Sequence, residues 1–163
     1  MTHLNFLRAV AVAACVAIVT PIARAQEAVV PSSVHFIWMG GNDCPPCVAW
    51  RQTELPKLQR SPEFSAIRFS YVTKAIRSPV PPSFFLPSEV KPYKDKLDFA
   101  SSGRDGSPQA AVIVNGEVFD YFQGTRTAEE IESMLAAIRM GRPYPFDRCI
   151  KASTRWKTCE VRG

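Results

Sequence analysis

The chain has 163 residues, of which 46% are hydrophobic, with 20 lysines and arginines against 15 aspartates and glutamates. This length and hydrophobic content are sufficient for one domain with a buried core. The formal net charge of +5 comes from scattered residues, without a basic run or interleaved aromatics, which argues against a nucleic-acid-binding groove.

The first 25 residues have the three regions of a secretory signal peptide. A short segment with Arg8 precedes an apolar run over residues 9–19, and Ala23-Arg24-Ala25 fits a small-residue cleavage site. We therefore expect cleavage after Ala25 and a periplasmic or secreted protein. The alternatives are an uncleaved signal that anchors the domain at the membrane, and a lipoprotein signal ending at Cys15. In each case the folded part lies outside the cytoplasm, where disulfides persist.

Removal of residues 1–25 leaves 138 residues of the 163. The formal charge falls from +5 to +3, because Arg8 and Arg24 leave and no acidic residue does. Four cysteines remain, and an even number in an oxidising compartment predicts two disulfides. Among the three possible pairings we expect the local one. It joins Cys44 to Cys47 and Cys149 to Cys159.

The first half of the domain reads as strand, helix, strand. A β-rich run over residues 34–38 predicts a buried strand. Apolar residues at helical spacing over residues 47–59 predict a helix, which Pro56 should kink or shorten. An alternating pattern over residues 67–72 predicts a second strand.

A proline-rich insertion separates the two halves of the domain. Residues 78–92 include five prolines and predict irregular structure, followed by a short helix near residues 93–99. The insertion also contains Phe84-Phe85-Leu86, which we interpret as a small core contact, with a partner-binding surface as the alternative.

The second half reads as a hairpin and a helix. A continuous apolar strand over residues 110–114 is followed by Asn115-Gly116, a strong hairpin signal, and by a returning strand over residues 117–122. The sequence from Thr127 to Glu130 fits a capping box, and it opens an amphipathic helix that runs through Arg139.

This order of elements predicts an α/β fold. A β-α-β unit followed by a β-β-α unit implies a central mixed β-sheet with helices on both faces. We divide the chain into four parts. They are a signal peptide (1–25), a short linker (26–33), one domain (34–141) with an insertion at about 78–92, and a C-terminal extension (142–163).

The motif Cys44-Pro45-Pro46-Cys47 carries the most chemistry. Two thiols at this spacing, at the start of a helix, can close and reopen a disulfide, with one sulfur attacking and the other resolving. Zinc sites use the same spacing, so the motif alone leaves both chemistries open.

Three separated motifs resemble the thioredoxin superfamily. The first is the CxxC at a strand–helix junction, and the second is Gly106-Ser107-Pro108 directly before the strand at residues 110–114. The third is the hairpin at Asn115-Gly116, followed by Gly124 and the last helix. The resemblance runs from Val34 to Ala137 and implies a thioredoxin-like fold, similar to that of bacterial periplasmic thiol–disulfide oxidoreductases.

The resemblance also implies roles for individual residues. Cys44 is expected to be the nucleophile, at the positive end of the helix dipole, and Cys47 the less exposed resolving thiol. Pro108 is expected to be cis and to face the sulfurs. Ser107 is expected to offer its backbone groups, and also its hydroxyl, to a substrate. The expected partners are proteins that bear disulfides or thiols, and a membrane donor that re-reduces the pair. We expect no cofactor, no bound metal and no nucleic acid.

The residues around the motif favour a reducing couple. Pro45 and Pro46 lack N–H groups that could stabilise a thiolate at the helix start, no histidine lies between the cysteines, and Asp43 adds a negative charge. We therefore expect a reductase or interchange protein, not a strong oxidant.

The chain departs from the family pattern at two places. Asp43 stands where many thioredoxins carry tryptophan, and residues 37–39 contain none of the buried acid that takes the proton of the second thiol. His35 is a candidate for that proton transfer, although a lone strand histidine is more often structural.

Two other functions remain open at this point. A copper chaperone with a thioredoxin-like fold would use Cys44, Cys47 and His35 as ligands. A redox-inactive binding protein would keep the fold and lose the chemistry. We interpret Cys149–Cys159 as a structural disulfide, with a second redox pair as the alternative.

Overall fold

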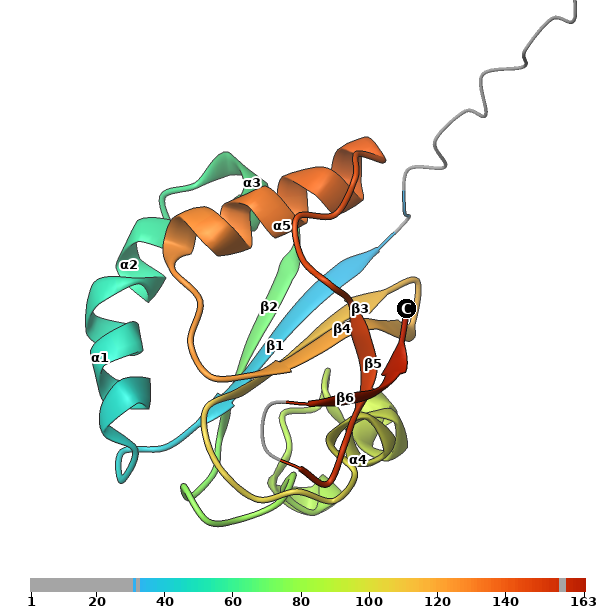
Figure 1. The fold of residues 1–163 in the computed structure, drawn as a ribbon. Coiled ribbons are helices and arrows are strands. Elements are labelled where there is room, and N and C mark those ends of the chain that lie inside the picture. Colours follow the sequence, from blue (N-terminus) through green and yellow to red (C-terminus); the bar gives the residue numbers. More distant parts are fainter. Residues whose placement is uncertain (1–30, 32, 156–157) are drawn as a thin grey trace, which may run out of the picture.

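The structure is a computed structural model that describes residues 31, 33–155 and 158–163 (Figure 1). The expected signal peptide and its cleavage site lie outside the described residues. Within the described part of the chain, no helix is both long and apolar enough to span a membrane.

A four-stranded mixed sheet forms the centre of the molecule, in the order β2-β1-β3-β4. The first two strands run parallel, while β3 pairs antiparallel with both β1 and β4. All four predicted strands are confirmed, each extended or shifted by one or two residues. Their bounds are Val34–Gly40 (β1), Arg68–Thr73 (β2), Gln109–Val114 (β3) and Glu117–Gln123 (β4).

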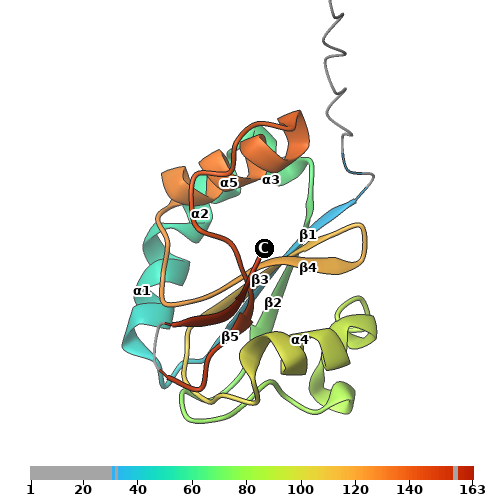
Figure 2. The same cartoon turned by 45° about the vertical axis from the view of Figure 1, so that its right-hand side comes forward.

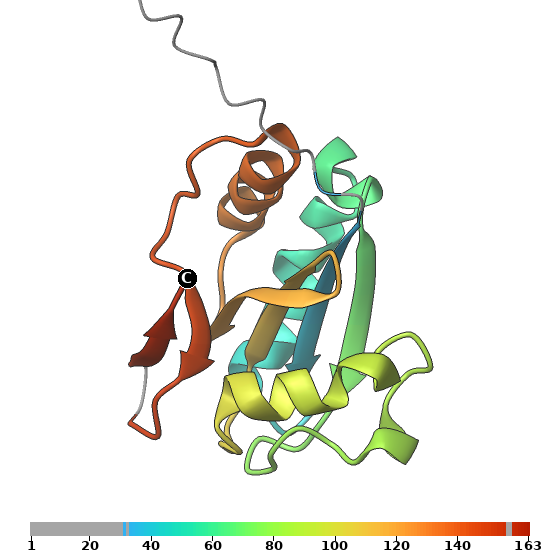
Figure 3. The same cartoon turned by 90° about the vertical axis from the view of Figure 1, so that its right-hand side faces the viewer.

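Four helices lie over one face of this sheet, and α4 (Lys94–Ser101) lies over the other (Figure 3). The four are α1 (Pro45–Thr53), α2 (Leu55–Leu58), α3 (Pro62–Ser65) and α5 (Ala128–Met140). The predicted α/β architecture, a mixed sheet with helices on both faces, is therefore confirmed.

The helix predicted over residues 47–59 is broken, as Pro56 led us to expect. The first segment ends at Thr53 and the second begins at Leu55, because Pro56 has no N–H and its ring clashes with the carbonyl four residues earlier. The next short helix, α3, was not predicted. Ser61 caps it, with its hydroxyl accepting the N–H of Phe64 at 3.3 Å.

Alternation along β1 divides the core into two clusters. Phe36 and Trp38 face α1 and α5, whereas Ile37 and Met39 face α4. All four side chains are buried, since helices cover both faces of this central strand. Only the β1 side chains on the face of Phe36 and Trp38 share a core cluster with Cys44 and Cys47.

The last helix begins and ends as predicted. Thr127 and Glu130 form the reciprocal capping box, and Gly141 ends the helix in a left-handed conformation with φ of 62°. Helix α5 therefore covers the α1 side of the sheet at the predicted place.

The C-terminal extension forms a hairpin that was not predicted. Strands β5 (Cys149–Ala152) and β6 (Cys159–Arg162) pair antiparallel in a separate two-stranded sheet. The hairpin lies beside β4, the edge strand of the main sheet (Figures 1 and 2). The Cys149–Cys159 disulfide, with an S–S distance of 2.15 Å, joins its two strands as the local pairing predicts.

The insertion contains two short 3₁₀ turns, Ser83–Phe85 and Lys91–Tyr93. The core contact that we expected is made by Leu86, which is 4% exposed. Phe84 and Phe85 are 72% and 69% exposed, so for these two residues the expectation of a core contact is wrong. The two rings pack against each other at a tilt, with centroids 4.0 Å apart and an interplanar angle of 42°.

Candidate functional site

The candidate site lies where β1 ends and α1 begins. Cys44 and Cys47 form a disulfide with an S–S distance of 2.00 Å, which confirms the expected pairing. Cys44 is the N-cap residue of α1, in an extended conformation. Its sulfur therefore belongs to the end of the helix where the macrodipole is positive.

The first turn of α1 offers few amides to a thiolate. Pro45 and Pro46 have no N–H, and the N–H groups of Cys47 and Val48 both donate to the carbonyl of Cys44, at 2.9 and 3.0 Å. The amides nearest to the cysteines are thus either missing or already used within the turn. This agrees with the sequence argument for a less acidic Cys44.

Both cysteines are fully buried, each 0% exposed. We expected Cys47 to be less exposed than Cys44, and in this disulfide form that difference is absent. The burial follows from the packing of the CxxC turn into the cluster that holds Trp38 and Trp50. An external thiolate can therefore reach a sulfur only after neighbouring side chains move.

Gly40, the last residue of β1, is required by the packing of Cys47. A Cβ atom at Gly40 would lie 2.7 Å from the Cys47 sulfur and 2.6 Å from the ring of Trp38. Real Cβ atoms do not approach other atoms so closely, and only glycine leaves the backbone free for this contact. The sulfur of Cys47 therefore packs directly against the end of β1.

Residues 37–39 supply no buried acid beneath the disulfide, and aromatic rings pack there instead. Trp38 stacks on Trp50 with ring centroids 4.5 Å apart, and on Tyr71 with centroids 5.2 Å apart. The indole N–H of Trp50 donates to the carbonyl of Arg126 at 2.8 Å, which ties α1 to the loop before α5. The surroundings of the disulfide on this side are apolar and aromatic.

Pro108 approaches the same glycine from β3. The Ser107–Pro108 peptide bond is cis, as we expected. Met39 pairs with Gln109 across β1 and β3, so the register continued by one residue sets Pro108 opposite Gly40. Gly40 thus adjoins both Cys47 and Pro108, which brings together the two motifs that are 60 residues apart in the sequence.

Ser107 is only 8% exposed, and its hydroxyl is buried without a hydrogen-bond partner among the described residues. Pro108 donates nothing, but its carbonyl accepts the N–H of Gly124 at 3.0 Å. That bond pins the start of β3 to the end of β4, and the φ of 96° at Gly124 explains why this residue is glycine. The backbone of Ser107, and not its enclosed hydroxyl, is the better candidate for contact with a substrate.

The loop between β1 and α1 is held by side-chain hydrogen bonds. The carboxylate of Asp43 accepts the N–H of Ile76 at 3.0 Å, and Asn42 accepts a hydrogen bond from Arg51 at 2.5 Å. Asp43 therefore anchors the CxxC loop to the segment that follows β2.

Lys74 is a residue of this site that the sequence analysis missed. It follows β2, is 3% exposed, and donates from its ammonium to the carbonyl of Gly106 at 2.6 Å. Burial lowers the pKa of Lys74 from 10.5 to about 8, and the charge of Asp105 partly offsets this effect. No local pattern distinguishes Lys74, because its burial depends on a loop more than 30 residues away.

His35 lies at the opposite end and on the opposite face of β1 from the CxxC turn, so the structure does not support the proton-relay alternative. It sits at the start of β1, on the α4 face with Ile37 and Met39, while the CxxC turn is on the opposite face. Its Nε2 is 2.9 Å from the hydroxyl of Ser70. The histidine is therefore a structural residue, as the commoner interpretation held.

The position of His35 also argues against the copper site that was considered as an alternative. A copper site built from Cys44, Cys47 and His35 would need ligands from opposite faces and opposite ends of β1. Among the described residues, there is no group of three or more histidine, cysteine, aspartate or glutamate side chains that could hold a metal ion.

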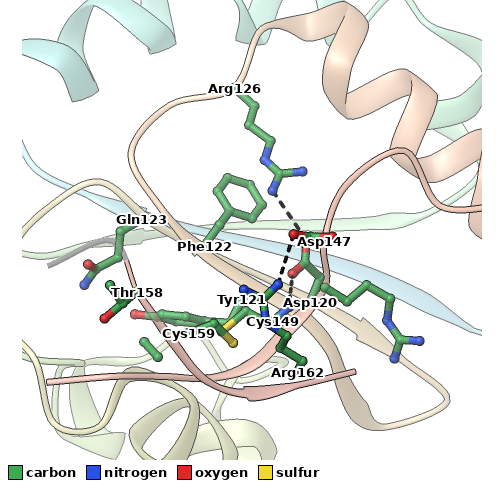
Figure 4. A pocket seen from close by; sticks show the side chains of 12 residues that line it. Asp120, Tyr121, Phe122, Gln123, Arg126, Asp147, Cys149, Thr158, Cys159 and Arg162 are labelled. Carbon is green, nitrogen blue, oxygen red and sulfur yellow. Dashed lines mark hydrogen bonds and ion pairs between the residues drawn. A yellow bond between two sulfur atoms is a disulfide. The ribbon is translucent and has the colours of Figure 1, made fainter. Parts of the chain in front are cut away.

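A separate cavity of about 500 Å³ lies between β4 and the C-terminal hairpin (Figure 4). Four of its charged side chains form two ion pairs, and the fifth, Arg148, donates to the carbonyl of Phe119. Arg126 lies 3.7 Å from Asp120, and Arg162 lies 3.0 Å from Asp147. The Cys149–Cys159 disulfide forms part of the wall, away from the Cys44–Cys47 site.

No protein-family model matches the chain, and a search of curated proteins returns no match.

Proposed function

We propose that the protein is an exported thiol–disulfide oxidoreductase with a thioredoxin-like fold, in which Cys44 and Cys47 are the redox pair. The observation that carries the proposal is the meeting of two motifs at Gly40. The Cys47 sulfur packs against this glycine, and the cis-proline Pro108 is set opposite it by the β1–β3 register.

The proposed reaction transfers two electrons from the reduced pair to a client. The Cys44 thiolate attacks one sulfur of a client cystine, forming a mixed disulfide and releasing a client thiolate. Cys47 then attacks the Cys44 sulfur, which restores the Cys44–Cys47 disulfide and releases the second client thiol. An external dithiol or a membrane donor must reduce the pair before the next cycle.

The positions of Cys44 and Cys47 in α1 support their roles as nucleophile and resolving thiol. Cys44 is the N-cap, where the helix dipole favours a thiolate, and Cys47 lies within the first turn against Gly40. An incoming client strand would pair with the backbone at Ser107 and Pro108. Because both sulfurs are enclosed in the disulfide form, the cycle includes a local opening of the site.

The cysteines are proposed to form a reducing or interchange couple. Strong oxidants owe their potential to a stabilised thiolate, and here the first turn of α1 supplies almost no free N–H groups. Export by the N-terminal signal would place this reaction in the periplasm, with proteins bearing disulfides or thiols as substrates.

The test is a trapping experiment with the Cys47→Ser variant. Without the resolving thiol, the mixed disulfide between Cys44 and a client should persist, and nonreducing electrophoresis should show adducts that dithiothreitol releases. The matched control is Cys44→Ser, which should form none.

Two outcomes would contradict the proposal. Adducts in Cys44→Ser but not in Cys47→Ser would reverse the roles of the cysteines. Absence of adducts in both variants, together with failure of the wild-type dithiol to reduce insulin as a probe cystine, would exclude disulfide exchange as the function.

A further inference from the structure

Lys74 is buried in a way that is unusual for lysine. It is 3% exposed, and lysines are almost never fully buried unless they are paired. In the described part of the chain no carboxylate lies within ion-pair distance of its ammonium. Burying a charge with so little compensation opposes folding, so packing alone does not explain this residue.

Lys74 connects the two loops of the candidate site. Its backbone N–H donates to the carbonyl of Gly40 at 3.2 Å, and its own carbonyl lies where a Cβ of Gly41 would come within 2.3 Å. Its ammonium reaches the carbonyl of Gly106 at 2.6 Å. One residue therefore attaches both to the end of β1 and to the loop before Pro108.

The loop that Lys74 reaches has no regular structure of its own. Gly103 and Gly106 have φ values of 66° and 97°, which are conformations that other residues rarely adopt. On its other side, the amide of Gln109 donates to the carbonyls of Arg104 and Asp105. Lys74 supplies the attachment from the side of the CxxC loop.

We propose that Lys74 is a positioning residue, whose ammonium holds Gly106-Ser107-Pro108 against the CxxC loop so that a client strand can pair beside the disulfide. This inference rests on the proposed function. It predicts that loss of the ammonium weakens client binding, while the exchange step itself changes little.

The test compares Lys74→Met with Lys74→Arg and with Lys91→Met. Methionine keeps the chain length and removes the charge, arginine keeps a donor, and Lys91 is an exposed lysine that serves as the matched control. The assay is reduction of insulin in the presence of dithiothreitol. We expect Lys74→Met to raise KM about tenfold with kcat within twofold of wild type, and Lys91→Met to leave both unchanged.

Recovery in Lys74→Arg would support the hydrogen bond to Gly106 as the cause. An unchanged KM in a folded Lys74→Met protein would overturn the proposal, as would a fall in kcat at constant KM.

The pH dependence of wild-type KM gives a second test that needs no variant. As Lys74 loses its proton above a pKa of about 8, KM should rise between pH 7 and pH 9.5. The other titratable groups around it are Asp43, Asp105, Tyr71 and the cysteines. Burial raises the pKa of Tyr71 above its usual value of 10, so its hydroxyl stays protonated over most of this range. If Lys74→Met does not fold, a flat KM profile overturns the proposal.

Hydrogen exchange separates this inference from the proposed function. In Lys74→Met, the amides of residues 102–107 should exchange faster than in Lys91→Met, whether or not the protein reduces disulfides. If wild type reduces no cystine, the proposed function fails. The role of Lys74 in holding the loop is then judged by amide hydrogen exchange alone. Equal amide exchange rates in Lys74→Met and Lys91→Met would reject that role.

Discussion

At the scale of single residues, His35 shows how burial changes chemistry. Ser70 donates its hydroxyl proton to Glu89 at 2.8 Å, so it accepts from Nε2–H of His35, and Nδ1 carries the lone pair. That Nδ1 has no hydrogen-bond partner in the described structure. Burial first, and then the charge of Arg68, lowers the pKa of His35 from 6.5 to about 4, while Glu89 partly offsets the shift.

This shift predicts a loss of stability in mild acid. Between pH 6.5 and pH 4 the unfolded chain protonates His35 and the folded protein does not, so the unfolding free energy falls as the pH falls. The contribution is on the order of 3 kcal/mol over the whole window. Urea unfolding at pH 7, 5.5 and 4 should show a steeper decline for wild type than for His35→Gln.

Two carboxylates also contribute to the pH dependence. The pKa values of Glu54 and Glu89 are lowered, mainly by hydrogen bonds, so both also destabilise the fold in acid. Glu54 contributes equally in the two proteins, whereas Glu89 is linked to His35 through Ser70, so the difference between the profiles reports this linked pair. Identical pH profiles for the two proteins would show that His35 titrates normally in the folded state.

At the scale of elements, the C-terminal hairpin is attached to β4 through one buried carboxylate. Asp120 is 1% exposed and accepts the N–H of Cys149 at 2.9 Å and the hydroxyl of Tyr144 at 2.8 Å. Arg126, which stacks over Phe122 and Phe146, lies 3.7 Å from the same carboxylate. The hairpin thus covers the edge of the main sheet, which would otherwise offer unpaired backbone groups.

We predict that the Cys149–Cys159 disulfide stabilises the fold and takes no part in catalysis. Replacing both cysteines with serine should lower the unfolding free energy by about 2–3 kcal/mol, because the bond closes a loop of roughly ten residues. Urea unfolding measures the stability, and insulin reduction measures activity per folded molecule.

Activity should be unchanged in this double variant below its unfolding transition. The Cys149–Cys159 disulfide lies in the wall of the cavity beside β4, and the Cys44–Cys47 pair does not line this cavity. Loss of exchange activity in a folded double variant would contradict the structural role and favour a second redox pair.

At the scale of the whole molecule, the redox potential is a balance between groups from several elements. The first turn of α1 gives a Cys44 thiolate little support, and the neighbouring charge of Asp43 opposes it. The ammonium of Lys74 donates to the carbonyl of Gly106, so we expect the groups at the start of α1 to dominate the potential.

The potential of the Cys44–Cys47 pair should therefore be nearer to about −270 mV than to about −120 mV. Equilibration with defined ratios of glutathione or dithiothreitol, followed by alkylation and mass spectrometry, measures it. A value near the oxidising end would reject the reductase assignment and leave disulfide exchange itself intact.

Local sequence patterns were sufficient for most of the architecture. Cys44 and Cys47 are close in the chain, so their disulfide follows from spacing. The alternation of apolar residues, the Asn115-Gly116 turn and the Thr127 capping box are also local signals, and each predicts its element from a few neighbouring residues. The sequence by itself therefore determined the order of the four main-sheet strands and of the helices after β1 and β4, the mixed sheet and the position of the thiol pair.

Only the tertiary structure decided the features that depend on distant contacts. The face occupied by His35, the contact of Gly40 with Cys47, the burial of Lys74 against Gly106 and the burial of Cys44 each require knowledge of what packs opposite. The β5–β6 hairpin is of the same kind, because it forms against the edge of β4. Gly40 and Cys47 are seven positions apart, but most of the other contacts join residues tens of positions apart, and no periodicity in the sequence encodes such a pairing.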